Sequence, residues 1–414
     1  MKKKISLVAL LLVVSMVFAA CSSSGSDSSS GEKLSAKDTT LVTDVIDKGE
    51  VGSAVILTYP EAVKGSDLSP SDFAVFAGAK SRNIQAVYTS EKKAVGTPAE
   101  KGKYVVLELN PSDANASTLV FDVEKFINSR ANMSYTVKQT ATVKSDKGTE
   151  YAPTASMAVK DTVTPILDQF KGDTFKDGDN KMAYRLYSPT TESSDSAKKP
   201  LIIYLHGSGE RGDDNEMQLL GTDGPATFAG KSFQTTTPSY VLAPQVPWDK
   251  ERNGWFNEGQ TQMVKKLIDK VVSEHSDIDT SRIYISGVSN GATGTWKMLV
   301  ENPDFFAAAL PISGYMYDAN AEFVQDGTAR YLAPNKEDAA KIKDIPIWAF
   351  QAEDDPVNSV QGSLQAVQAV KDAGGTKIQM TEYPSGLVTP NPHAAWEKAY
   401  NNSQALTWLV SNHK

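Results

Sequence analysis

The spacing of apolar residues changes near Pro165, and this change constrains the fold more than any other feature of the chain. From about Asp38 to Lys160, short runs of alternating apolar and polar residues are separated by Pro, Gly, Asn and Asp, without a long helical period. The runs read SAVILTY, FAVFAG, IQAVYT, KYVVLELN, TLVFDV and MSYTVKQTATVKS. Regularly spaced short strands are typical of a β-sandwich. We therefore predict an immunoglobulin-like sandwich over residues 38–160, although the cysteine pair and core Trp of antibody domains are absent.

Residues 165–414 show strand-like runs that alternate with helix-like stretches. A hairpin, KGDTFKDGD and KMAYRLYSP, is followed by LIIYLHG, SYVLAPQ, RIYISG, AAALPISG, IPIWAFQ and KIQMTEY. The helix-like stretches are Gln260–His275, Ala292–Glu301, Ser359–Ala373 and Ala394–Asn412. This alternation indicates a mainly parallel sheet covered by helices on both faces, in the element order of an α/β-hydrolase. A chain of 414 residues also exceeds what one ordinary core accommodates, so two domains are expected.

The N-terminus has the features of an export signal. Residues 1–20 combine a basic start, a short apolar stretch and small residues at the end, which together predict a signal peptide. The segment 18–21, Phe-Ala-Ala-Cys, resembles the lipobox of bacterial lipoproteins, which implies that Cys21 is acylated and anchors the protein to the membrane at the cell surface. Cleavage after Ala20 without lipidation, or an uncleaved anchor, are the alternatives. Residues 21–37, from Cys21 onward, are rich in Ser and Gly and predict a flexible tether.

Composition excludes several classes of function. Cys21 is the only cysteine, so the exported chain has neither an intramolecular disulfide nor a cysteine nucleophile. Four histidines, with no pair at ligand spacing, predict no metal site, and no cofactor is expected. The formal net charge of −8 disfavours nucleic acid as a partner.

The strongest local motif is Gly-Val-Ser-Asn-Gly at residues 287–291. It follows a predicted strand and precedes a predicted helix, which is the context of a G-x-S-x-G nucleophile elbow. The glycines permit a tight turn that exposes the Ser289 hydroxyl beside the N-H groups of the helix start. The sequence therefore predicts that Ser289 is a nucleophile.

A serine nucleophile requires a base, and in this fold the base follows the last strand. Only His393 and His413 come late enough, and His413 is the penultimate residue, where chains are usually frayed. We therefore predict His393 as the base. The orienting acid is expected after the strand IPIWAF, where Glu353, Asp354 and Asp355 all remain possible.

The run HGSGERG at residues 206–212 directly follows the strand LIIYL. In this fold the corresponding loop supplies a main-chain donor to the oxyanion, so we predict that the N-H groups of Ser208 and Asn290 form the oxyanion hole. His206 precedes the elbow and is expected to form structural hydrogen bonds. Glu210 and Arg211 either pair to brace the loop or lie on the surface.

Trp248 and Trp255 lie in the segment APQVPWDKERNGWF. We predict that they line an apolar pocket for the acyl or aryl group of a substrate, with packing in the core as the alternative.

Several motifs together resemble one family: LHGSGERGDDN, APQVP with NGWF, DTSRIYISGVSNGATGTW, ALPISG, EDDPV and PHAAW. They are similar to bacterial esterases related to polyhydroxybutyrate depolymerases and feruloyl esterases, a group often labelled predicted peptidases, whose members can carry an immunoglobulin-like domain in front. The resemblance is detailed from about Phe170 to the end. It implies that the acid is Asp355, which precedes Pro-Val, with Asp354 second, and that His393 is the base. Asn290 and Gln351 depart from the family pattern, which has Met and His there.

These features predict a serine carboxylesterase that hydrolyses short-chain acyl, aryl or feruloyl-type esters, free or linked to polysaccharide, through an acyl-enzyme. One alternative is a cell-surface lipoprotein that binds a glycan or a partner and uses the hydrolase domain as a scaffold. Another alternative is a serine peptidase.

Overall fold

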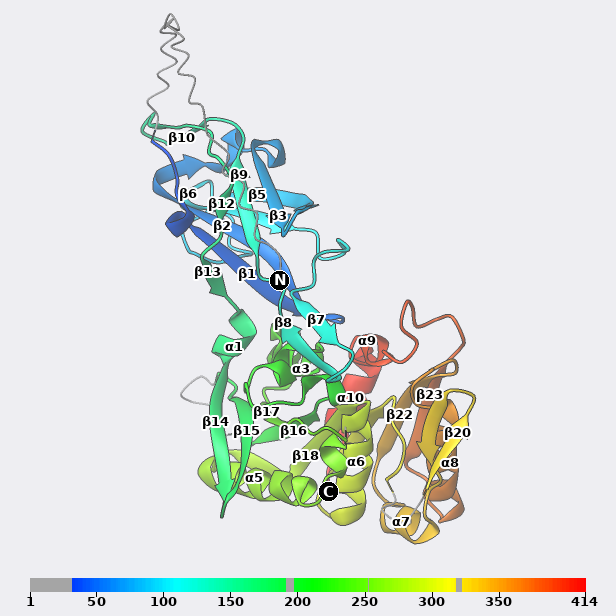
Figure 1. Ribbon diagram of the computed structural model, residues 1–414. Coiled ribbons are helices and arrows are strands. Elements are labelled where there is room, and N and C mark those ends of the chain that lie inside the picture. The colour runs from blue at the N-terminus through cyan, green and yellow to red at the C-terminus, as the bar shows by residue number, and fades with distance from the viewer. Residues whose placement is uncertain (1–31, 191–196, 252, 318–321) are drawn as a thin grey trace, which may run out of the picture.

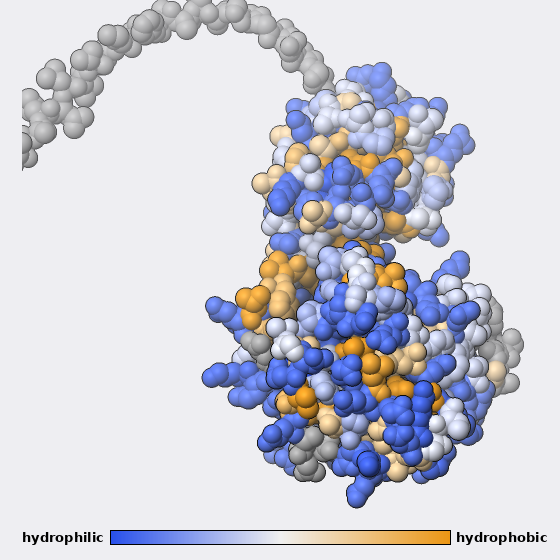
Figure 2. Space-filling model, turned by 90° about the vertical axis from the view of Figure 1, so that its right-hand side faces the viewer, coloured by the Kyte–Doolittle hydropathy of each residue, from blue (hydrophilic) through white to orange (hydrophobic). Residues whose placement is uncertain are grey.

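The structure is a computed structural model that describes residues 32–190, 197–251, 253–317 and 322–414. An all-β lobe is followed by a larger α/β lobe, and a narrow waist joins them (Figure 1; Figure 2). Apolar side chains gather on the visible face near this waist (Figure 2). The predicted signal peptide and Cys21 lie outside the described residues.

The N-terminal lobe is a sandwich of two sheets, with strand orders β13-β1-β2-β6-β5 and β12-β9-β3-β4. Alternate positions point into a shared core, where Val55 and Leu57 of β2 pair with Leu107 and Val105 of β6, all fully buried. The predicted sandwich is confirmed. The strands are β1 (Thr39–Ile46), β2 (Gly49–Lys64), β3 (Phe73–Ala77), β4 (Lys80–Arg82), β5 (Ile84–Ser90), β6 (Lys101–Leu109), β9 (Tyr135–Gln139), β12 (Met157–Ala158) and β13 (Asp161–Val163).

Two small hairpins extend from this sandwich. One consists of β7 (Leu119–Asp122) and β8 (Ile127–Arg130), the other of β10 (Val143–Lys144) and β11 (Glu150–Tyr151). The run TLVFDV, predicted as a sandwich strand, forms β7 and pairs only with β8 because neither of its faces is buried in the sandwich. The β7–β8 hairpin lies at the junction and points toward the α/β lobe (Figure 1).

The second lobe is built on an eight-stranded sheet of order β14-β15-β17-β16-β18-β19-β22-β23. The antiparallel hairpin β14–β15 forms one edge, and the strands from β17 to β23 run parallel. Strands β16, β17 and β19 are buried along their whole length, as expected for a sheet covered on both faces. The predicted α/β-hydrolase fold is confirmed. The strands are β14 (Phe170–Asp177), β15 (Asn180–Tyr187), β16 (Lys199–Leu205), β17 (Tyr240–Gln245), β18 (Ile278–Val288), β19 (Ala308–Ile312), β22 (Ile347–Ala352) and β23 (Ile378–Tyr383).

Helices cover the two faces of this sheet over two separate apolar cores. One core contains residues of α5 (Gln260–Glu274), α6 (Asn290–Glu301), α7 (Lys336–Lys341) and α8 (Val360–Asp372). The other contains residues of α2 (Met217–Leu220), α3 (Gly224–Ala229), α4 (Lys231–Thr236), α9 (Trp396–Ala399) and α10 (Ser403–Ser411). No helix in the described part of the chain has the length and apolar character needed to cross a bilayer.

One helix prediction needs correction. The stretch 394–412 forms two helices, α9 and α10, rather than one. The side chain of Asn402 accepts hydrogen bonds from the N-H groups of Gln404 and Ala405, which caps α10 and separates it from α9.

The two lobes are joined by apolar and charged contacts. Val45 and Leu119 of the sandwich pack into an apolar core of the α/β lobe. Arg130 of β8 binds the buried Glu50 through two hydrogen bonds, of 2.8 and 2.9 Å, and reaches Glu216 of the α/β lobe at 3.3 Å. These contacts hold the β7–β8 hairpin against the α/β lobe. A short helix, α1 (Pro165–Gln169), links the lobes in sequence.

Candidate active site

Ser289 lies in the turn between β18 and α6. Its φ of 54° and ψ of −119° are unfavourable for a residue with a Cβ atom. The turn can be this tight because glycines flank it: a Cβ on Gly287 would collide with the main chain of Gly291, and a Cβ on Gly291 would collide with Leu205 O. The strained turn places Ser289 in the wall of a cavity at the end of the sheet.

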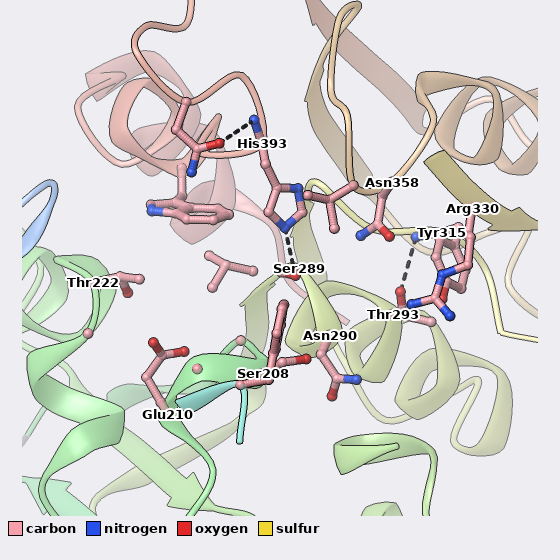
Figure 3. Close-up of a pocket in the computed structure, with 18 of the residues that line it drawn as sticks. Ser208, Glu210, Thr222, Ser289, Asn290, Thr293, Tyr315, Arg330, Asn358 and His393 are labelled. Atoms are coloured by element: carbon pink, nitrogen blue, oxygen red, sulfur yellow. Dashed lines mark hydrogen bonds between the residues drawn. The ribbon is translucent and has the colours of Figure 1, made fainter. Parts of the chain in front are cut away.

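Ser289, His393 and Asp355 form a continuous chain of hydrogen bonds. His393 Nε2 lies 2.8 Å from Ser289 Oγ (Figure 3), and His393 Nδ1 lies 2.9 and 3.0 Å from the two carboxylate oxygens of Asp355. The three residues come from the loops after β18, β23 and β22. When Nδ1 donates to the carboxylate, Nε2 of the neutral ring accepts from the serine hydroxyl. The arrangement can therefore take the proton from Ser289.

Asp355 differs from its two acidic neighbours in burial and in partners. It is 5 % exposed, whereas Glu353 and Asp354 are exposed. Glu353 accepts from the N-H of Ser385, and Asp354 accepts from the N-H of Gly386. Of the three acids, Asp355 is the one that contacts His393.

Gln351 holds Asp355 in place, a role that the sequence did not reveal. Its Nε2 donates to Asp355 Oδ2 at 3.1 Å and to Asn358 O at 2.7 Å, and its Oε1 accepts from Ser363 Oγ at 2.5 Å. The N-H groups of Val357 and Asn358 donate to Asp355 Oδ1 at 2.8 and 3.0 Å. Three donors thus support the acid in addition to His393, which fixes its orientation.

The predicted oxyanion donors lie on the same cavity as Ser289. Ser208 begins a short 3-10 helix, η4 (Ser208–Glu210), and its carbonyl accepts from Arg211 Nε at 2.8 Å. Asn290 is the first residue of α6, where an N-H has no intrahelical partner. The Asn290 side chain accepts from the N-H of Trp255 at 3.0 Å, which ties the elbow to the loop after β17.

His206 is a structural residue of this loop. It is fully buried, donates from Nδ1 to Gly207 O at 2.6 Å and accepts at Nε2 from the N-H of Val246 at 3.1 Å. Burial lowers the pKa of His206 to about 4, so the ring is neutral near pH 7.

Glu210 and Arg211 brace the loop, but not as a pair with each other. Arg211 binds Asp249 at 3.0 Å. Glu210 Oε1 accepts from Asn128 Nδ2 at 2.9 Å, across the junction between the lobes. Burial raises the pKa of Glu210 to about 7. A buried carboxyl of the loop after β16 is therefore bound by the N-terminal lobe.

The cavity has a volume of about 680 Å³ and is lined by both lobes. The β7–β8 hairpin contributes Phe121, Phe126 and Asn128. A second hairpin, β20 (Phe323–Asp326) and β21 (Ala329–Leu332), contributes Phe323 and Arg330. Sequence reasoning missed all five side chains, because they belong to segments that carry no motif. The closely spaced Phe121 and Phe126, on either side of a turn, were the available signal.

The prediction that Trp248 and Trp255 line the substrate pocket is wrong. Trp255 is fully buried beneath the cavity and donates from Nε1 to His206 O at 2.8 Å. Trp248 lies outside the cavity and donates from Nε1 to Lys125 O of the β7–β8 hairpin at 3.0 Å. Their indole N-H groups join segments: Trp255 holds the loop of His206, and Trp248 holds the β7–β8 hairpin. Trp396 lines the cavity instead and packs edge-on against His393.

Within the described residues, no group of three or more His, Cys, Asp or Glu side chains is placed to hold a metal ion.

Comparison with known proteins identifies both lobes. Residues 38–152 match the family described as the esterase Ig-like N-terminal domain. A solved structure, the crystal structure of a thermostable esterase, is 36 % identical and superimposes with a TM-score of 0.81, covering 91 % of this chain and 100 % of the other. The chain belongs to the esterases with an N-terminal immunoglobulin-like domain. It is thus a carboxylic ester hydrolase.

Curated relatives match this esterase at lower identity. Poly(3-hydroxyalkanoate) depolymerase C of Paucimonas lemoignei is 25 % identical over 52 % of this chain and 54 % of its own length. Acetylxylan esterase A of Emericella nidulans is 21 % identical over 60 % of this chain and 85 % of its own. The esterase thus spans about half the length of the depolymerase that it matches.

Proposed function

We propose that the esterase cleaves its substrate with Ser289 as nucleophile, His393 as general base and acid, and Asp355 as the residue that orients His393. The observation that carries this proposal is the hydrogen-bond chain from Asp355 through His393 to Ser289, at a strained elbow in the wall of a cavity. Burial of His393 and Asp355 keeps bulk water from competing for these hydrogen bonds.

Two half-reactions follow from this geometry. Ser289 Oγ attacks the ester carbonyl carbon while its proton moves to His393 Nε2, and the N-H groups of Ser208 and Asn290 stabilise the oxyanion. As the intermediate collapses, His393 returns the proton to the departing alcohol, which leaves an acyl group on Ser289. Water, deprotonated by His393, then attacks the acyl carbon to give a second oxyanion. As the bond to Ser289 Oγ breaks and the carboxylic acid leaves, His393 returns the proton to Ser289 Oγ.

The cavity supports a substrate of moderate size with an apolar part. Its volume of about 680 Å³ exceeds the need of an acetyl group, and Phe121, Phe126, Phe256 and Trp396 provide aromatic surface. We propose that the substrates are short-chain acyl, aryl or feruloyl-type esters, either free or linked to polysaccharide. Relatives named as an acetylxylan esterase and a poly(3-hydroxyalkanoate) depolymerase fit this range.

A panel of p-nitrophenyl acyl esters, methyl ferulate and a peptide p-nitroanilide tests the proposal on the wild type and on Ser289→Ala. We expect ester turnover by the wild type, no turnover of the peptide amide, and a loss of at least about 10³-fold in kcat for Ser289→Ala. Turnover that persists in Ser289→Ala would remove Ser289 from the mechanism. A faster reaction with the peptide would favour a peptidase, and no turnover of any substrate would favour a binding protein.

We also propose that the esterase is an exported lipoprotein acylated on Cys21. The lipobox-like segment 18–21 and the Ser/Gly-rich tether support this proposal, and both lie in sequence before the folded lobes. Cys21→Ser should move the protein from the membrane fraction to the soluble fraction or block its processing. An unchanged distribution between fractions would contradict the anchor.

A further inference from the structure

Arg330 is a cation in the cavity wall that the proposed mechanism does not use. It belongs to β21 and lines the same cavity as Ser289. Among the residues that the structure describes, no carboxylate forms an ion pair with Arg330, whereas Arg82, Arg130, Arg211 and Arg282 each have one. Its exposed guanidinium is therefore available to an anionic ligand.

The main chain of Arg330 is fixed relative to the catalytic acid. Its N-H donates to Val357 O at 3.2 Å, and its carbonyl accepts from the N-H of Ser359 at 3.3 Å. The same loop carries Asp355, whose carboxylate accepts from the N-H groups of Val357 and Asn358. Arg330 therefore occupies a defined place beside the reacting groups, although its side chain is exposed.

Aromatic rings support the guanidinium. Arg330 Cζ lies 5.3 Å from the ring centroid of Phe323, which packs edge-on against Tyr315 at 6.0 Å. Tyr315 in turn contacts Phe256 at 6.3 Å, and all three rings line the cavity. A guanidinium held over a ring still presents its in-plane N-H groups, which match the two oxygens of a carboxylate. The wall therefore combines an apolar surface with a site for an anion.

Charge is distributed unequally across the cavity. Arg330, Tyr315, Thr293 and Asn358 lie on one side of Ser289, and Glu210 and Thr222 lie on the other (Figure 3). Glu251 is the second carboxyl that lines the cavity. It lies two residues after Asp249, which forms an ion pair with Arg211. An ester bound at Ser289 extends its acyl and alcohol parts to different sides, so a negatively charged part is favoured beside Arg330 and disfavoured beside Glu210.

We propose that Arg330 binds a carboxylate of the substrate, so that the preferred esters carry an acidic group attached to an apolar or aromatic part. This inference rests on the proposed function, because it places the ester carbonyl at Ser289. Arg330 is then a specificity-determining residue, and it takes no part in the proton transfers.

Matched pairs of esters test this inference. In the first pair the charge is on the acyl part: mono-p-nitrophenyl adipate is compared with p-nitrophenyl hexanoate. In the second pair it is on the alcohol part: 4-acetoxybenzoate is compared with 4-acetoxybenzamide. For each pair, kcat/KM is measured for wild type, Arg330→Gln, Arg330→Lys and the control Arg282→Gln, which removes the same charge from a pair with Asp279.

For one of the two pairs we expect the ratio of charged to neutral kcat/KM to fall by about 10-fold to 100-fold in Arg330→Gln, mainly through KM. Arg330→Lys should retain part of the ratio, added salt should reduce it in the wild type, and Arg282→Gln should leave it unchanged. The affected pair identifies the side on which the acidic part binds. In Arg330→Gln, the loss in kcat/KM on the neutral ester of the affected pair should be at least about ten-fold smaller than the loss on the charged ester.

Two outcomes would overturn the inference, and only one of them would also refute the proposed function. Turnover of neutral esters with charged-to-neutral ratios that are the same in wild type and Arg330→Gln would exclude the carboxylate site and leave the proposed function intact. No turnover of any of the four esters by the wild type would refute the proposed function, and the inference with it.

Discussion

Two β-hairpins flank the cavity, and they are attached to the α/β lobe in different ways. The β20–β21 hairpin is fixed by main-chain hydrogen bonds between Arg330 and the loop of Asp355. The β7–β8 hairpin comes from the sandwich and is fixed by side chains: Asn128 donates to Glu210, Arg211 donates to Phe126 O, and Trp248 donates to Lys125 O. Both place a phenylalanine in the cavity wall.

The positions of the two hairpins therefore depend on the sequence to different degrees. Main-chain hydrogen bonds survive a change of side chain, so most residues of β20–β21 can vary while the hairpin stays in place. Asp326 is the exception, because its carboxylate accepts from Ser359 Oγ at 2.9 Å. The position of β7–β8 depends on particular side chains in both lobes, so a single substitution can loosen it. The proposed reacting groups, Ser289, His393 and Asp355, line the cavity or contact a residue that lines it, and they belong wholly to the α/β lobe.

The largest effect is therefore expected at the reacting groups, independently of either hairpin. Asp355→Asn should lower kcat by about 10⁴-fold on every ester, because His393 loses the charge that orients and stabilises it. Asp354→Asn, the matched control, removes an exposed carboxylate bound to the N-H of Gly386 and should change kcat by less than about ten-fold. The comparison is made on variants whose Tm matches that of the wild type, because a lost hydrogen bond of the buried Asp355 could mimic lost catalysis. A greater loss in folded Asp354→Asn would show that the acid is assigned to the wrong residue.

Shortening the aromatic side chains of β7–β8 should alter substrate selection and leave the chemistry intact. The double variant Phe121→Ala, Phe126→Ala removes apolar surface from one wall, so kcat/KM for aryl and feruloyl-type esters should fall by roughly ten-fold. The change for acetate esters should be much smaller, because an acetyl group does not reach this wall. Equal losses on both kinds of ester would indicate that the hairpin supports the reacting groups themselves.

Removing the donor of Glu210 tests how tightly the hairpin is attached. Asn128→Ala leaves a buried carboxyl without its partner from the sandwich, so the free energy of unfolding should fall by about 1–3 kcal/mol. Denaturant unfolding of the full-length protein measures this change. Asn132→Ala is a suitable control, because Asn132 is exposed and binds only within the sandwich, at Ser117 O. Equal stability of Asn128→Ala and wild type would show that the hydrogen bond contributes nothing.

The same carboxyl predicts a dependence of stability on pH. Burial raises the pKa of Glu210 from an ordinary 4.5 to about 7, so the folded protein holds this proton to higher pH than the unfolded chain. The resulting stability is complete below about pH 4.5 and is lost as the pH rises through about 7. Glu210→Gln stays neutral, so its Tm should rise relative to the wild type between pH 5 and pH 8. A constant difference in Tm over this range would contradict the raised pKa.

The smallest effect is expected at Trp248. The residue is 45 % exposed, lies outside the cavity and contributes one hydrogen bond to the hairpin. Trp248→Phe should therefore leave KM for all esters within about two-fold and lower Tm only slightly. A selective increase in KM for aryl esters would show that Trp248 contacts the substrate.

The sequence by itself determined the main features of the fold and nominated residues for a candidate reacting group. Alternation of apolar residues every second position predicted the sandwich, and buried-strand runs between helices predicted the parallel sheet. The elbow motif selected Ser289, and chain order left His393 as the preferred base. The two fold predictions are confirmed, and all four depend on local properties: side-chain periodicity, the freedom of glycine, and the order of elements along the chain.

The tertiary structure alone decided which side chains meet. Chain order alone left three adjacent acids open, although the family resemblance favoured Asp355, and in the structure Asp355 is the one that turns inward to Gln351 and His393. Trp255 is buried because its main-chain and indole N-H groups donate to Asn290 Oδ1 and His206 O. Phe121 and Arg330 reached the cavity from hairpins that lie about 200 residues apart in sequence. Such contacts depend on the packing of distant segments, for which no local pattern in the sequence exists.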